Sequence, residues 1–111
     1  MKLILGTVQL GLDYGIYKKK PTYKESVEIL NYAIESSVFT FDTAQGYGNS
    51  EEILSNISHK KDTIIITKID FENLVTKEEI INKINISLTN LKVSKIDVLL
   101  LHNFNDFRNK Y

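Results

Sequence analysis

Four short apolar runs recur along the chain, with helical patterns between them. Each run is nearly continuous, which is typical of strands covered on both faces, as in a parallel sheet. The intervening segments instead repeat apolar residues every three or four positions, the spacing of a helix with one buried face. The runs span residues 3–5, 38–41, 64–66 and 98–101. This pattern predicts the order strand, helix, strand, helix, strand, helix, strand.

Polar residues mark where the predicted helices begin. Thr22 and Glu25 have the spacing of a capping box, in which each side chain bonds the backbone N–H of the other, and Thr76 and Glu79 repeat it. The middle helix is expected to begin within residues 48–50, where the acids that follow favour the positive end of a helix dipole. This alternation predicts an α/β fold with right-handed crossovers. The pattern alone is compatible with both an open doubly wound sheet and a barrel.

Composition is that of an ordinary globular domain. Of 111 residues, 42% are hydrophobic and 25% are charged, and no second composition regime divides the chain, so we expect a single domain over residues 1–111. Basic and acidic residues number 14 each, so the net charge favours neither nucleic acid nor a membrane surface as a partner. The lysines and tyrosines of the loop at residues 14–23 are expected to be solvated.

Cysteine is absent, which excludes disulfide bonds and thiolate chemistry and fits a reducing compartment. No apolar run approaches the roughly 18 residues that a membrane-spanning helix needs. Polar residues interrupt the N-terminal apolar run at once, unlike in a signal peptide. We therefore expect a cytoplasmic protein, and we expect no metal site.

Polar residues end three of the predicted strands. Asp42, Lys68 and His102 follow the second, third and fourth apolar runs, and Tyr47 lies in the loop after Asp42. Because the carboxyl ends of parallel strands meet at one edge, these side chains should converge where α/β folds place their active sites. Each residue taken singly also has an ordinary structural explanation, such as a turn aspartate or a solvated lysine. Because the four residues occur together, they favour a catalytic site. His59 is not accompanied by such residues and is expected at the surface.

Strand alternation predicts which side chains share a side of the sheet. Even-numbered positions of the last three runs lie on the side of Asp42, Lys68 and His102. The helices should cover the opposite side, which carries Phe39, Phe41, Ile65, Thr67, Leu99 and Leu101.

The residues around these positions resemble the aldo-keto reductases. Leu5–Thr7 ends the first strand, and a stretch of the form Asp-x4-Tyr-Gly-x-Ser-Glu spans Asp42–Glu51. Ile66–Lys68 and Leu99–His102 end the later strands in the expected order. The resemblance runs from residue 3 to about residue 103. Within it, the first strand and the loop that follows resemble, more weakly, the branch found in bacterial cell-surface sugar pathways.

The resemblance implies NADPH-dependent reduction of a small carbonyl compound, an aldehyde or ketone, to an alcohol. Tyr47 would protonate the carbonyl oxygen while hydride arrives from the cofactor. Lys68 would help the tyrosine release its proton, and His102 would orient the carbonyl. Asp42 would hold Lys68 and contact the nicotinamide ribose.

The family folds as an eight-stranded (β/α) barrel, whereas four strands are predicted here, so the resemblance implies the N-terminal half of a barrel. Gly6 and Thr7 would border the nicotinamide, but most of the dinucleotide site would be missing. We therefore expect the chain by itself to be inactive and to self-associate through exposed strand edges. The alternative is a non-catalytic α/β domain or remnant that binds a partner through those edges.

Overall fold

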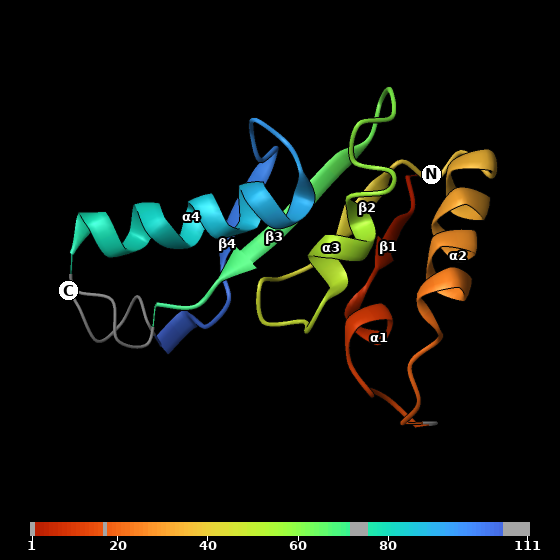
Figure 1. Cartoon of the computed structure of the whole chain (residues 1–111), viewed down its shortest axis with the longest axis horizontal. Helices are drawn as coiled ribbons and strands as arrows, with labels where there is room; N and C mark the ends of the chain where they lie inside the picture. Colours follow the sequence, from red (N-terminus) through yellow and green to blue (C-terminus); the bar gives the residue numbers. More distant parts are fainter. Residues whose placement is uncertain (1, 17, 72–75, 106–111) are drawn as a thin grey trace.

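The computed structural model describes residues 2–16, 18–71 and 76–105, and its centre is a sheet of four parallel strands. The strands are β1 (Ile4–Gly6), β2 (Thr40–Asp42), β3 (Ile64–Ile69) and β4 (Val98–Leu101), and they lie in that order across the sheet. The helices are α1 (Val8–Gly11), α2 (Tyr23–Glu35), α3 (Ser50–Leu54) and α4 (Lys77–Leu91). The sheet of consecutive parallel strands joined by helices (Figure 1) has the architecture of half of a TIM barrel, as predicted.

The structure confirms the predicted order of elements and adds to it. β3 continues to Ile69, three residues beyond its apolar run, so that Lys68 lies inside the strand. The short helix α1 follows β1 directly and was not predicted. A single turn is too short for a periodic pattern of apolar residues to reveal it.

Both predicted capping boxes form. At the start of α2, the Thr22 N–H donates to the Glu25 carboxylate (2.7 Å), and the Glu25 N–H donates to Thr22 Oγ1 (3.3 Å). Thr76 and Glu79 repeat this arrangement at α4, with 2.9 Å and 3.2 Å for the same two bonds. These bonds satisfy N–H groups that have no partner within the helix, so they fix where α2 and α4 begin.

The core lies between the sheet and its helices, on the side that alternation predicts for β2 and β3. Phe41 and Thr67 are fully buried and Ile65 is 3% exposed, whereas Ile64 on the other side of β3 is 41% exposed. The helices contribute Leu30 from α2, Ile53 and Leu54 from α3, and Leu91 from α4. His59 lies at the surface, as expected.

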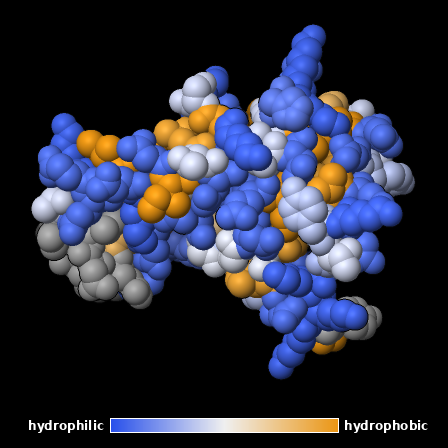
Figure 2. Space-filling view, viewed as in Figure 1, coloured by the Kyte–Doolittle hydropathy of each residue, from blue (hydrophilic) through white to orange (hydrophobic). Residues whose placement is uncertain are grey.

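The prediction that helices cover Leu99 and Leu101 is wrong. These residues are 38% and 42% exposed, and Val98 and Leu100 on the other face of β4 are exposed to the same degree. The reason is that α4 packs against β3 and leaves both faces of β4 partly open. Figure 2 shows hydrophobic residues among the polar ones on the face that it draws. Ile81 and Ile86 of α4 are about half exposed. Within the described ranges, no helix has the length and apolar character needed to cross a bilayer.

The capping box of α2 predicts a pH-dependent contribution to stability. Hydrogen bonds from the Thr22 backbone and then its hydroxyl hold the pKa of Glu25 below its ordinary value of 4.5. A carboxyl whose folded-state pKa is lowered stabilises the fold above its unfolded-state pKa, and this contribution is lost as the pH falls through the folded-state value. We therefore expect Glu25→Ala to lower the thermal unfolding midpoint at pH 7 and to matter less near pH 3.

Circular dichroism at the two pH values measures this difference. Glu28→Ala is the matched control, because Glu28 lies one turn further along the same helix and makes only an exposed contact with Lys24. A Glu25→Ala effect that is equally large at both pH values would contradict the prediction.

Candidate active site

The carboxyl ends of the strands bring the four predicted site residues together. Asp42 is the last residue of β2, and Lys68 is the next-to-last of β3. The Lys68 ammonium forms an ion pair with the Asp42 carboxylate and donates a second bond to the Thr43 carbonyl oxygen (2.9 Å). The two charged side chains are 17% and 35% exposed, so water screens them only partly. The ion pair and the bond to Thr43 together hold the Lys68 ammonium beside Asp42.

The Tyr47 ring contacts both a cation and an imidazole. The Lys68 ammonium lies 5.3 Å from the centre of this ring, and the centre of the His102 ring lies 5.5 Å from it, with the two rings perpendicular. His102 follows β4 and is held by its backbone N–H, which donates to the Ile69 carbonyl oxygen (2.9 Å). The three groups therefore meet at one end of the sheet, on the side that the strand alternation predicts.

The segment between β2 and Tyr47 continues the pairing with β3 beyond the end of β2. The N–H groups of Thr43 and Gln45 donate to Ile66 and Lys68 carbonyl oxygens of β3, at 2.8 and 3.0 Å. The Gln45 side chain continues to α4, where its amide nitrogen donates to the Lys83 carbonyl oxygen at 2.8 Å. The loop that presents the phenol is thus tied to elements on both sides of it.

Gly6 and Thr7, the other two residues predicted to contact the cofactor, differ in their exposure. Gly6 is exposed and lines a hollow of about 990 Å³ between β1, α1, α2 and the segment before α2. Thr7 is fully buried, and its hydroxyl donates to the Asp42 carbonyl oxygen (3.0 Å). Its side chain therefore braces the end of β1 against β2.

Sequence reasoning missed a buried carboxylate behind the site. Glu51 is 2% exposed and accepts bonds from Thr67 Oγ1 (2.7 Å) and the Asn90 side-chain amide (3.0 Å). It lies in the first turn of α3, where an acid is ordinarily solvated. Its place in the Asp-x4-Tyr-Gly-x-Ser-Glu stretch was visible in the sequence, but only the packing of α3 against β3 and α4 shows that it is buried.

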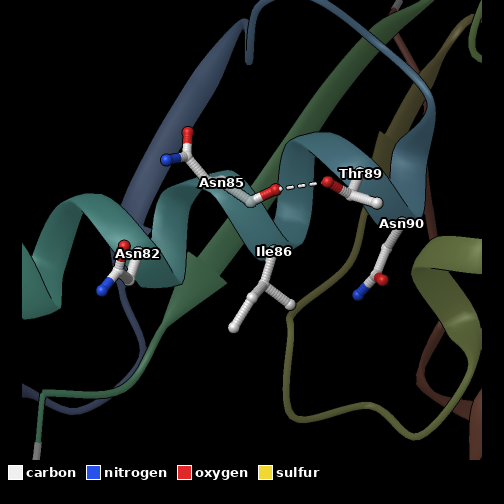
Figure 3. Close-up of a pocket in the computed structure, with 5 residues that line it drawn as sticks. All are labelled: Asn82, Asn85, Ile86, Thr89 and Asn90. Carbon is white, nitrogen blue, oxygen red and sulfur yellow. Dashed lines mark hydrogen bonds between the residues drawn. The ribbon is translucent and has the colours of Figure 1, made fainter.

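A second hollow, of about 450 Å³, lies on α4 and away from the four site residues (Figure 3). It is lined by Asn82, Asn85, Ile86, Thr89 and Asn90. Two of its polar side chains are already engaged, because Thr89 Oγ1 donates to the Asn85 carbonyl oxygen and Asn90 donates to Glu51. The described residues contain no group of three or more potential metal ligands. The strand-end cluster is therefore the candidate site.

A phenol that contacts an ammonium and an imidazole can donate a proton to an oxygen atom bound beside it. The positive charge of the ammonium stabilises the negative charge that develops on the phenol oxygen, and the carboxylate holds the ammonium in place. Protein side chains supply no hydride, so a reduction at this site needs a cofactor.

The fold and its strand-end site define an α/β protein built as half of a TIM barrel. The model of the Aldo/keto reductase family matches residues 2–107, and the chain belongs to this family. A solved structure of a protein from Pseudomonas aeruginosa, provisionally named an aldo-keto reductase, is 28% identical with a TM-score of 0.74. A second, with the same source and naming, is 26% identical with a TM-score of 0.72.

These comparisons also show how much of a family member is present. The matches cover 91% of this chain but only 42% and 41% of the two Pseudomonas aeruginosa chains. A comparison with curated proteins finds no significant match. The chain thus spans about two fifths of the length of the solved structures that it matches.

The burial of Glu51 predicts a large difference between two neighbouring glutamates. Glu51→Ala leaves the Thr67 hydroxyl and the Asn90 amide without their acceptor, and each buried unsatisfied donor costs about 1–3 kcal/mol. Glu52→Ala is the matched control, because Glu52 is exposed on the same turn of α3. Chemical denaturation should show a clear loss of unfolding free energy for the first variant and a change within about 0.5 kcal/mol for the second. Equal effects of the two substitutions would contradict this assignment.

Proposed function

We propose that this chain supplies the proton-donating half of an NADPH-dependent reductase that converts a small aldehyde or ketone to an alcohol. The observation that carries the proposal is the Tyr47 ring in contact with both the Lys68 ammonium and the His102 ring, with Asp42 paired to the lysine. Membership of the Aldo/keto reductase family supports the same reaction class.

Each of the four residues has a defined task in the proton transfer. The Tyr47 hydroxyl donates its proton to the carbonyl oxygen, and the Lys68 charge stabilises the phenolate that is left. The His102 imidazole hydrogen-bonds the same oxygen and so orients the carbonyl group. Asp42 holds Lys68 in place through their ion pair. The alcohol forms when hydride has joined the carbonyl carbon and the tyrosine proton has joined its oxygen.

NADPH, when bound, supplies the hydride, and two residues of the chain suit its nicotinamide end. The Asp42 side chain is 35% exposed, so it can accept a bond from a ribose hydroxyl as well as hold Lys68. At Gly6 an added Cβ would meet nothing within 4 Å among the described atoms, so this end of β1 leaves room for a flat ring. NADPH is preferred to NADH here only on the basis of the family.

The remaining contacts to substrate and cofactor must come from further strands. β4 is 38–43% exposed along its whole length, and Leu3 and Ile4 at the other side of the sheet are 56% and 57% exposed. A closed barrel has no such edges, because its first and last strands pair. We therefore propose that the edges at β1 and β4 pair with other polypeptide, and with further copies of this chain when nothing else is present.

Removing the phenol hydroxyl tests the proposed acid. In the enzyme completed by its remaining strands, Tyr47→Phe keeps the ring and its contacts but removes the proton donor, so carbonyl reduction should fall by roughly 10² to 10⁴. Cofactor affinity, measured by fluorescence titration, should change little. Tyr23→Phe makes the same chemical change at the start of α2, where the hydroxyl accepts a bond from the Asn56 amide (2.8 Å), and should leave the rate unaltered. Near-normal turnover by Tyr47→Phe would show that another group is the acid.

The chain by itself should neither reduce carbonyl compounds nor bind NADPH tightly. We expect size-exclusion chromatography to show dimers or larger species, because the open strand edges are apolar and the net charge of zero provides little repulsion. A titration with NADPH should show no binding in the low micromolar range. A compact monomer that binds NADPH at such concentrations would contradict the half-site proposal.

A further inference from the structure

The short helix α1 touches the turn that carries Tyr47 backbone to backbone. A Cβ added to Gly11, its last residue, would stand 1.7 Å from the Tyr47 carbonyl oxygen and 2.8 Å from the Ser50 amide nitrogen. From the other side, a Cβ on Gly48 would stand 2.2 Å from the Gly11 carbonyl oxygen. The two glycines thus let two backbone segments lie closer together than any side chain permits.

Neither partner in this contact can move aside cheaply. The nearest atom that an added Cβ would meet is a main-chain carbonyl oxygen in both cases, and Cβ atoms essentially never approach other atoms to less than 3.0 Å. An alanine at position 11 would therefore push α1 and the Tyr47 turn apart by more than 1 Å. Gly48 has a second reason to be glycine, because its φ of +56° lies in the left-handed region.

A buried cluster of hydroxyl groups holds the same turn from within. Ser50 Oγ donates to the Thr7 carbonyl oxygen (3.1 Å), and it also lies 2.8 Å from the Thr7 hydroxyl and 3.0 Å from that of Thr43. All three residues are fully buried. The Ser50 N–H in turn donates to the Tyr47 carbonyl oxygen (3.0 Å), the atom that faces Gly11. This cluster and α1 together restrain the Tyr47 turn.

We propose that Gly11 is a positioning residue for Tyr47: its lack of a side chain seats the Tyr47 turn against α1 and thereby sets the distances from the phenol ring to Lys68 and His102. The inference adds a role for α1 to the proposed function, and its kinetic consequence rests on that function. Its structural consequence does not, because the seating of the turn is measurable without catalysis.

Gly11→Ala separates the two consequences. Hydrogen exchange of the chain, followed by mass spectrometry, should show exchange at least about tenfold faster in residues 43–50 and unchanged exchange in β3. In the completed enzyme, kcat should fall about 10²-fold, the usual effect of misplacing a catalytic group by about 1 Å. The dissociation constant for NADPH should stay within about twofold. Alanine is the better helix former, so a more stable Gly11→Ala protein with unchanged exchange would overturn the proposal.

Thr76→Ala is the control for general destabilisation, because it removes a helix cap of α4 and touches nothing near Tyr47. It should speed exchange in the first turn of α4, which precedes the Lys83 and Ser87 contacts with Gln45, while leaving residues 43–50 and kcat unchanged. If Gly11→Ala does not fold, Ser50→Ala tests the same seating without adding atoms and should act in the same direction. If exchange becomes uniformly faster across the chain in both variants, the contact between α1 and the Tyr47 turn stabilises the fold as a whole and does not position Tyr47. That result would overturn the proposal. Faster exchange confined to residues 43–50, together with a completed wild-type enzyme that reduces no carbonyl compound, would support the seating and refute the proposed reaction.

Discussion

The parallel register between β2 and β3 is the constraint on which the rest of the site depends. Pairing continues past the end of β2, because the Thr43 and Gln45 N–H groups still bond β3. Lys68 therefore lies level with the start of the turn and reaches Asp42 across one strand spacing. A slip of one residue would turn Lys68 to the side that the helices cover and bring Thr67 to the site. The ion pair and the contact with Tyr47 both follow from this one alignment.

The segment after β2 serves two faces of the sheet. The Tyr47 ring lies beside Lys68 and His102 at the carboxyl end of the sheet. Ser50 and Glu51, three and four residues later, are buried. Each of these two buried side chains has hydrogen-bond partners, from the hydroxyls of Thr7 and Thr43 in one case and from Thr67 and Asn90 in the other. Fully satisfied buried polar groups specify one geometry more sharply than apolar packing does, because each bond has a direction. The buried hydrogen bonds of Ser50 and Glu51 therefore restrain the turn that carries Tyr47.

The same architecture explains why the proposed activity needs more polypeptide. In a complete barrel, every strand has a neighbour on each side and a helix outside it. β2 and β3 meet this condition here, and their outer residues Phe41 and Ile65 are buried. β4 does not, and its four residues are similarly exposed on both faces. The proposed catalytic groups lie on and after β2, on β3 and after β4, whereas enclosure of substrate and cofactor depends on what pairs with the outer strands.

The sequence by itself determined the features that depend on local spacing: the strands, the two capping boxes, the buried side of β2 and β3, and the four residues at the strand ends. It could do so because period, capping and strand polarity act within one element or between consecutive ones. Only the tertiary structure decided that Thr7 and Glu51 are buried, that Gly11 lies against Tyr47, and that Leu99 and Leu101 are open. Each of these depends on contact between segments that are distant in the chain, which no local pattern of residues records.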